Sequence, residues 1–201
     1  HIKKLAAAGF TDIVINHAWL GDKIEAALGS GAKWQVNLQY SDESQQALET
    51  AGGIIKALPL LGAEPFLVVN GDVFTDFNFN ELPALSSDHL AHLFLVKNPD
   101  HNLSGDFSIK NGQLTLLADD TDTLSFTYSG IAIFHPNFFS EHLSTALSGR
   151  KEIQLPRGDI LPLAPMLRLA AKANTISACV INSAWTDVGT PQRLAQLNQR
   201  S

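Results

Sequence analysis

The sequence contains a single cysteine, Cys179, so no disulfide bond can form within the 201 residues. This scarcity of cysteine favours a reducing compartment. No apolar stretch approaches the roughly 20 residues that a membrane-spanning helix needs. The first residues are too few and too polar for a signal peptide. These absences lead us to expect a cytoplasmic protein with no membrane segment.

Charge is also sparse. Charged residues make up only 17% of the chain, with 14 Lys and Arg against 20 Asp and Glu and a formal net charge of −6. No basic stripe runs along the sequence, which argues against binding to nucleic acid. Hydrophobic residues make up 45%, which is typical of a folded globular protein rather than a disordered one. Without a linker or repeat, we expect one domain over residues 1–201.

Short apolar runs alternate with helical patterns in the first third of the chain. This alternation is typical of an α/β fold whose strands are covered by helices on both faces. We therefore expect a mainly parallel mixed sheet of Rossmann-like type. The predicted strands are Asp12–Asn16, Val36–Tyr40 and Pro65–Asn70, and the predicted helices are Leu20–Leu28 and Gln46–Leu58, the second stopped by Pro59.

The rest of the chain continues this pattern with an antiparallel insertion. Asn111-Gly112 suits a tight turn with positive φ, and it predicts a hairpin between two short strands. Thr190 followed by Pro191 predicts a capped terminal helix. The other predicted strands are Ala91–Val96, Phe126–Phe134 and Ile176–Ile181, and the other predicted helices are Phe138–Leu147 and Ile160–Ala171.

The chain begins with a residue other than Met, and its first residues already follow a helical pattern that Gly9 ends. No capping residue precedes this helix. We interpret the sequence as a fragment whose upstream part is missing.

The strongest local signal for chemistry is Asn70-Gly71-Asp72, directly after an apolar strand. Ligands of open α/β sheets bind beyond the carboxyl ends of the strands. A carboxylate at such a place can hold Mg²⁺ together with phosphate and water oxygens. The alternative is a turn aspartate that bonds its own backbone.

Asp187 gives a second carboxylate of the same kind, in Trp-Thr-Asp-Val-Gly-Thr-Pro at 185–191. It comes just past a predicted strand and just before a predicted helix, so Asp72 and Asp187 are expected to meet on one metal at the sheet edge. The alternative is that Asp187 only complements the positive end of the last helix.

A third element is Leu-Glu-Thr-Ala-Gly-Gly-Ile at 48–54, whose glycines let a planar group lie against the backbone while Glu49 and Thr50 offer polar contacts. A glycine pair near a helix start also serves simple packing. Three histidines, His89, His92 and His101, lack the partners and spacing of a metal site. No nucleophile motif is present, and Cys179 is interpreted as a small buried hydrophobe.

Four ordered motifs together resemble the sugar-1-phosphate nucleotidylyltransferases. They are Gly-Phe-Thr-Asp-Ile-Val-Ile-Asn at 9–16, the glycine-containing run at 48–54, Phe-Leu-Val-Val-Asn-Gly-Asp-Val at 66–73, and the run at 185–191. The resemblance covers essentially the whole chain. Within the family it is strongest to the branch that joins UTP to N-acetylmuramate-1-phosphate in bacterial cell-wall recycling, because of residues 14–21 and 54–61.

The resemblance implies that a sugar-1-phosphate oxygen attacks the α-phosphate of UTP and that pyrophosphate leaves. Asp72 and Asp187 match the family's metal-binding carboxylates, here for Mg²⁺, and act as the catalytic pair. The other implied roles are nucleotide binding by Glu49, Thr50 and Gly52, and substrate binding by Asn70, Asp106 and Gly130. No oligomeric state is implied.

The family's opening strand and Gly-rich phosphate loop have no match here, which agrees with a fragment. That strand is central in the expected sheet, so its neighbours should have unpaired edges. We expect the 201-residue chain alone to have little or no transferase activity. Two other functions stay open: a hexose-1-phosphate nucleotidyltransferase such as one using GTP and mannose-1-phosphate, and a non-catalytic nucleotide-sugar-binding domain. The sequence just upstream would discriminate catalysis from binding alone.

Overall fold

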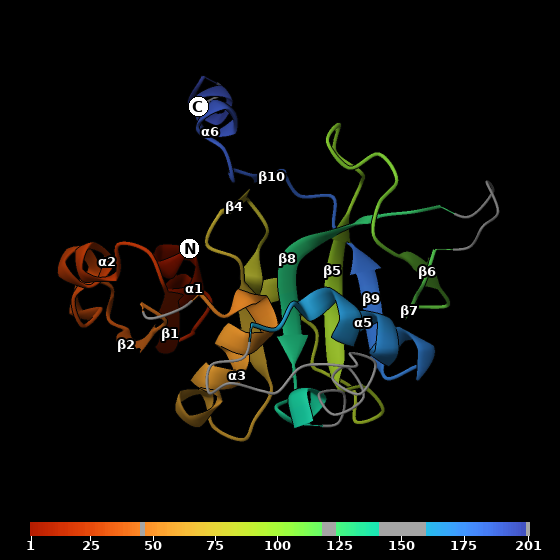
Figure 1. Ribbon diagram of the computed structural model, residues 1–201, viewed down its shortest axis with the longest axis horizontal. Helices are drawn as coiled ribbons and strands as arrows, with labels where there is room; N and C mark the ends of the chain where they lie inside the picture. Colours follow the sequence, from red (N-terminus) through yellow and green to blue (C-terminus); the bar gives the residue numbers. More distant parts are fainter. Residues whose placement is uncertain (45–46, 118–123, 141–159, 200–201) are drawn as a thin grey trace. The chain divides into compact units, whose positions relative to one another are not determined.

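The computed structural model describes residues 1–44, 47–117, 124–140 and 160–199 (Figure 1). These residues form two compact units, each of which is described by itself. Unit 1 comprises His1–Glu64, Phe79–Leu82 and His135–Leu169, and unit 2 comprises Pro65–Asn78, Pro83–Phe134 and Ala170–Ser201.

Unit 1 is built around two parallel strands that follow the predicted alternation of helices and strands. Strand β1 pairs with β2 along its full length, from Asp12 opposite Asn37 to His17 opposite Asp42. The first helix ends before Gly9, which takes the positive φ of 88° that suits the end of a helix. The elements are α1 (Ile2–Ala7), β1 (Asp12–His17), α2 (Gly21–Leu28), η1 (Ala32–Trp34), β2 (Asn37–Asp42), α3 (Glu49–Leu61) and η2 (Phe79–Glu81).

Unit 2 contains a six-stranded mixed sheet in the order β3-β8-β5-β9-β7-β6 and a separate antiparallel pair, β10-β4. Strands β8, β5 and β9 lie side by side in Figure 1 and carry most of the buried apolar residues. The elements are β3 (Phe66–Val69), β4 (Val73–Thr75), β5 (Ala91–Val96), β6 (Ser108–Lys110), β7 (Gln113–Thr115), β8 (Thr127–Phe134), β9 (Ile176–Val180), β10 (Trp185–Asp187) and α6 (Pro191–Asn198); α5 (Leu163–Lys172) contributes to both units.

The α/β class and the mixed sheet are confirmed, and so are the hairpin and the Thr190 cap. Asn111 and Gly112 take φ values of 53° and 76° between β6 and β7, and the Thr190 hydroxyl accepts a hydrogen bond from the Arg193 amide. Among the described strands, antiparallel pairs outnumber parallel ones. A strand that is buried on both faces is apolar along its whole length, whether its neighbours are parallel or antiparallel to it. The apolar pattern in the sequence therefore does not distinguish parallel from antiparallel pairing.

The prediction that Pro59 ends its helix is wrong. Helix α3 runs from Glu49 to Leu61 with Pro59 inside it. Proline has a helical φ of its own and removes one backbone donor, and here the helix continues for two more residues. Of the helix predicted over Phe138–Leu147, residues 138–140 are helical and 141–147 lie outside the described residues.

Two apolar strands stand at sheet edges. Strand β1 has β2 as its hydrogen-bonded neighbour among the described strands, and β3 has β8. The residues of β3 are only half-buried although all four are hydrophobic.

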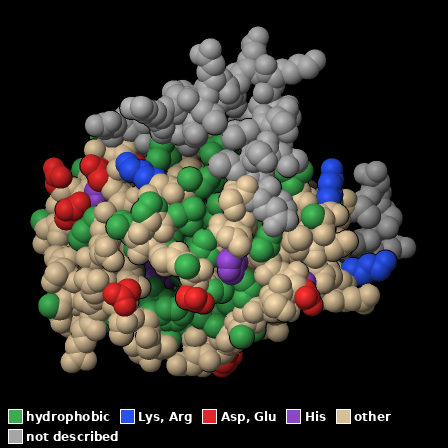
Figure 2. Space-filling view, turned by 90° about the horizontal axis from the view of Figure 1, so that it is seen from below, with side chains coloured by type: hydrophobic (Ala, Val, Ile, Leu, Met, Phe, Trp, Pro, Cys, Tyr) green, Lys and Arg blue, Asp and Glu red, His purple; other side chains and the backbone are tan. Residues whose placement is uncertain are grey.

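Charged side chains are thinly spread over the surface. In Figure 2, hydrophobic and uncharged side chains occupy most of the face drawn, and the described Lys and Arg side chains lie at separate places on it. No helix formed by the described residues is both long and apolar enough to cross a membrane.

A bulge in β8 depends on Gly130. The pairing of β5 with β8 shifts register between Phe94 and Leu95. Gly130 has a φ of 77° there, and a Cβ added to it would lie 2.9 Å from the side-chain amide carbon of Asn70. The Ser129 hydroxyl supports the bulge because it donates to the Phe94 carbonyl oxygen, 2.6 Å away.

We predict that Gly130→Ala lowers the free energy of unfolding by about 2 kcal/mol or more, because it combines an unfavourable φ with a collision against Asn70. Gly112→Ala is the matched control, since Gly112 has a φ of 76° with open space around its missing Cβ. Its cost should be about 1 kcal/mol. Urea unfolding measures both variants, and equal losses would mean that Asn70 does not confine Gly130.

Candidate functional site

Asp72 and Asp187 are brought together by the short antiparallel pair β4–β10. The chain leaves β3 at Val69, turns through Asn70-Gly71-Asp72 and enters β4 at Val73. Asp187 ends β10 directly opposite Val73. The Val188 amide donates to the Asp72 carbonyl oxygen at 2.6 Å. The two carboxylates therefore approach through antiparallel pairing, and not through the carboxyl ends of adjacent parallel strands as the sequence suggested.

Both carboxylates face a small space above Gly189. The position that a Cβ on this glycine would take lies 3.6 Å from Asp72 Oδ2 and 3.9 Å from Asp187 Oδ2. Gly189 itself is exposed, so this space is open to solvent. Two carboxylates near one point are a favourable place for a cation, because like charges this close destabilise each other unless positive charge lies between or beside them.

Two basic side chains, Arg193 and His101, contact Asp187. Its Oδ2 lies 3.0 Å from Arg193 Nη2 and its Oδ1 lies 3.1 Å from His101 Nε2. The His101 contact lacks hydrogen-bond alignment, and Asp187 Oδ1 is buried with no hydrogen-bond partner among the described residues. An oxygen left in this way fits a role as a ligand of a hard cation such as Mg²⁺. The sequence analysis did not identify Arg193, and it considered His101 only together with His89 and His92, because neither residue belongs to a pattern that points at Asp187.

The described residues contain no group of three or more His, Cys, Asp or Glu side chains arranged as a metal site. A cation between Asp72 and Asp187 would therefore take most of its ligands from elsewhere. Mg²⁺ commonly binds in this way, through one or two carboxylates with phosphate and water oxygens completing the octahedron. The donor set thus fits a cation that arrives with a phosphorylated ligand.

Asn70 and Gly130, both predicted to bind substrate, are neighbours. The Asn70 amide donates to the Gly130 carbonyl oxygen at 2.9 Å, and the Asn70 side chain lies over the Gly130 Cα. The indole of Trp185 donates to the Ser129 carbonyl oxygen at 2.8 Å. This bond ties the strand that carries Asp187 to the bulge that carries Gly130.

Asp106 has a structural role in a loop. Its Oδ2 accepts from the Tyr128 amide at 2.8 Å and its Oδ1 accepts from the Asn102 side chain at 3.1 Å. Both oxygens are thus engaged within the protein, at the start of β8. Contact between Asp106 and a sugar stays a prediction from the resemblance.

The predicted nucleotide-binding run lies in unit 1, at the start of α3. Glu49 and Thr50 are exposed, while Gly52 is buried. Glu49 has a φ of 61°, which is unfavourable for a residue with a side chain. The amides of Ala51 and Gly52 both donate to the Leu161 carbonyl oxygen, at 2.9 and 3.1 Å. These two hydrogen bonds fix the first turn of α3. The unfavourable φ lies at Glu49, the exposed first residue of the helix.

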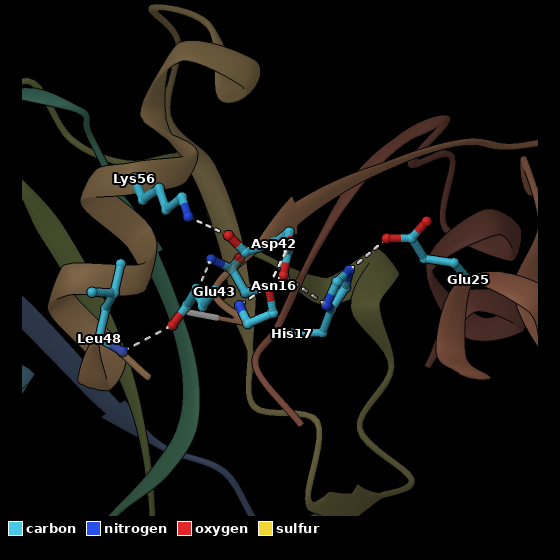
Figure 3. A network of polar contacts seen from close by, with 8 residues as sticks. Asn16, His17, Glu25, Asp42, Glu43, Leu48 and Lys56 are labelled. Carbon is cyan, nitrogen blue, oxygen red and sulfur yellow. Dashed lines mark hydrogen bonds and ion pairs between the residues drawn. The ribbon is translucent and has the colours of Figure 1, made fainter. Parts of the chain in front are cut away.

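The carboxylate of Glu43 is buried and accepts hydrogen bonds from the segment just before this helix and from β1 (Figure 3). Glu43 Oε2 accepts from the Leu48 amide at 3.0 Å, and Glu43 Oε1 accepts from the Asn16 side-chain amide at 3.0 Å. Asn16 also donates to the Gly53 carbonyl oxygen at 2.8 Å. A Cβ on Gly53 would lie 2.6 Å from Glu43 Oε1, so this glycine serves packing, the alternative that the sequence left open.

The same network extends to the ends of β1 and β2. His17 is buried, with Nε2 2.7 Å from Glu25 Oε1 and Nδ1 3.7 Å from Asp42 Oδ1. Lys56 on α3 donates to the Asp42 carbonyl oxygen. Hydrogen bonds from the Ser44 backbone amide and hydroxyl lower the pKa of the Asp42 carboxyl. These contacts attach α3 to the strands that precede it.

Cys179 is only half-buried, so the prediction that it is a buried hydrophobe is wrong. His92 on the neighbouring strand lies with Nδ1 2.8 Å from Ser177 Oγ and Nε2 3.4 Å from Cys179 Sγ. Burial raises the pKa of the Cys179 thiol and, together with His89, lowers the pKa of His92. The thiol therefore stays protonated, which agrees with the absence of a nucleophile motif.

Comparison with known proteins settles the family. The family model described as nucleotidyl transferase matches residues 1–201. The chain belongs to this nucleotidyl transferase family. It is 44% identical to an N-acetylmuramate alpha-1-phosphate uridylyltransferase of Neisseria meningitidis serogroup B, over 98% of this chain and 80% of that protein. A mannose-1-phosphate guanyltransferase of Hypocrea jecorina is 37% identical over 44% of this chain and 25% of its own length.

Solved structures share the fold of this chain. HddC from Yersinia pseudotuberculosis superposes with a TM-score of 0.73 at 17% identity, over 99% of this chain and 82% of that one. The same protein complexed with GMP-PN gives a TM-score of 0.72. At this low identity the likeness concerns the fold.

We predict that Glu43→Gln lowers the free energy of unfolding by about 1–3 kcal/mol, because the amide can accept from only one of its two partners and leaves the other donor unpaired. Urea unfolding followed by circular dichroism measures this loss. Glu64→Gln is the control, since Glu64 is exposed. A loss at Glu43 no larger than at Glu64 would mean that the buried carboxylate does not hold the start of α3.

Proposed function

We propose that this protein transfers a uridylyl group from UTP to N-acetylmuramate-1-phosphate, releases pyrophosphate, and serves the recycling of cell-wall sugars in the cytoplasm. The observation that carries the proposal is the Asp72–Asp187 pair, with a buried oxygen that lacks a hydrogen-bond partner, in a member of the nucleotidyl transferase family. The choice of UTP and of this sugar rests on 44% identity to a relative with that name over nearly the whole chain.

In the proposed reaction no protein side chain forms a covalent bond with a substrate, so the protein acts by positioning the substrates and neutralising charge. A phosphate oxygen of the sugar-1-phosphate attacks the α-phosphorus of UTP, and the bond from that phosphorus to the bridging oxygen of pyrophosphate breaks. The protein has to bring two anionic substrates together and hold them in line. Mg²⁺, when bound, would neutralise the charge that both substrates bring to the site.

The residues of unit 2 suit the metal and sugar parts of this task. Asp72 and Asp187 would hold Mg²⁺ through oxygens that lie near one exposed point. Gly130 has no side chain, and the side-chain amide of Asn70, which lies against it, would supply donors for sugar hydroxyls. In unit 1, Glu49 and Thr50 would contact the nucleotide, with Gly52 in the same turn.

We predict that Asp72→Asn and Asp187→Asn, made in the full-length protein, each lower kcat by about 10²-fold or more, because each removes one negative ligand of the cation while it keeps the side chain's shape. Pyrophosphate release with saturating UTP and sugar-1-phosphate measures the effect. Asp88→Asn is the control, as Asp88 is an exposed aspartate of unit 2. Near-normal turnover in either site variant at limiting Mg²⁺ would remove that residue from the proposed metal site.

We predict that kcat/KM is higher for UTP with N-acetylmuramate-1-phosphate than for GTP with mannose-1-phosphate, by about 10²-fold or more. The two pairs are compared in one pyrophosphate-release assay, with the crossed pairs included so that base and sugar preference are separated. A higher kcat/KM for GTP and mannose-1-phosphate would move the protein to the guanylyl branch. Release with neither pair would favour a nucleotide-sugar-binding role.

A further inference from the structure

The cation site of this protein contains a positive charge of its own. We propose that Arg193 competes with the divalent cation for Asp187 and thereby sets the cation affinity of the site, an inference that rests on the metal site of the proposed function. The relevant groups, Asp72, Asp187, Gly189 and Arg193, all belong to unit 2.

The guanidinium lies in the space that both carboxylates face. Arg193 Nη2 is 3.1 Å from the Cβ position of Gly189, the same point that lies within 4 Å of Asp72 Oδ2 and Asp187 Oδ2. Its 3.0 Å contact is with Asp187 Oδ2. A cation bound by these two oxygens and the guanidinium nitrogen therefore require overlapping positions.

Electrostatic repulsion also opposes simultaneous binding of the cation and the guanidinium at Asp187. A doubly charged cation and a guanidinium within a few ångströms repel each other, and the repulsion is strong because Arg193 and Asp187 are both largely screened from solvent, with 28% and 25% of their side chains exposed. Arginine does not lose its charge at accessible pH. The guanidinium must therefore move away before the cation can bind Asp187 through Oδ2.

The surroundings of Arg193 permit that movement. Its Nε is buried with no hydrogen-bond partner among the described residues, so the ion pair leaves part of the guanidinium unsatisfied. Helix α6, which carries Arg193, has no buried residue. Thr190 caps the helix independently of the ion pair, through the Arg193 backbone amide. The side chain can turn away while the first turn of α6 stays in place.

Titration with Mn²⁺ tests the competition without any turnover, by electron paramagnetic resonance of the free ion. Arg193→Gln and Arg193→Met remove the charge and should each bind Mn²⁺ about tenfold more tightly than the parent protein, a gain of about 1.4 kcal/mol. Arg193→Lys keeps the charge and should bind with nearly the parent affinity. Lys110→Gln removes an exposed positive charge of unit 2 and should leave the affinity unchanged.

Unchanged or weaker Mn²⁺ binding in both Arg193→Gln and Arg193→Met overturns the proposal, and so does equal tightening in Arg193→Lys. Circular dichroism confirms that each variant is folded before titration. Asp187→Asn in the Arg193→Gln background separates this failure from that of the proposed function. Undiminished Mn²⁺ binding there would mean that Asp187 is no ligand, which overturns the metal site together with the competition.

Discussion

Two carboxylates placed next to each other need positive charge nearby, and this constraint governs the part of the structure where function is proposed. The pairing of β4 with β10 brings Asp72 and Asp187 close to Gly189. Because the two negative charges repel each other, positive charge beside them stabilises the pair. Arg193 supplies positive charge in the protein itself, and the proposed divalent cation would supply it in the substrate complex. In the account proposed here, Arg193 and a divalent cation are alternative counter-ions for Asp187.

Glycine and tryptophan give this site its shape. Gly189 and Gly130 each let a neighbouring side chain lie where a Cβ would otherwise be, Arg193 beside the carboxylates at Gly189 and Asn70 at Gly130. Trp185 lies two residues before Asp187 and is hydrogen-bonded to the Ser129 carbonyl oxygen. A substitution in the β8 bulge would therefore be transmitted to the strand that carries Asp187. In unit 1, Glu43 accepts a hydrogen bond from the Leu48 amide just before α3, and the Leu161 carbonyl oxygen accepts hydrogen bonds from the first turn of α3. These bonds hold the backbone on both sides of Glu49, which has an unfavourable φ.

Much of the fold follows from the sequence, because strands such as Ala91–Val96 and the Asn111-Gly112 turn depend on local signals. The meeting of Asp72 with Asp187 was predicted, but its mechanism was not. Strands β4 and β10 have three residues each, too few for an apolar pattern to identify them. Arg193 and Glu43 were not found either. The Arg193 contact depends on how the turn from β10 to α6 folds, and the Glu43 contacts depend on β1 and the start of α3 meeting its side chain, and neither arrangement has a sequence pattern. Pro59 shows that a local signal can also mislead. Proline was predicted to end the helix, but α3 continues past it to Leu61.

Diffraction at the manganese absorption edge, from crystals grown with Mn²⁺ and a non-hydrolysable UTP analogue, tests the central claim most directly. We predict an anomalous peak within coordination distance of one oxygen each from Asp72 and Asp187, about 2.1–2.3 Å away, with the Arg193 guanidinium turned away from Asp187. A peak elsewhere, or one that contacts neither carboxylate while Arg193 remains paired with Asp187, would contradict it.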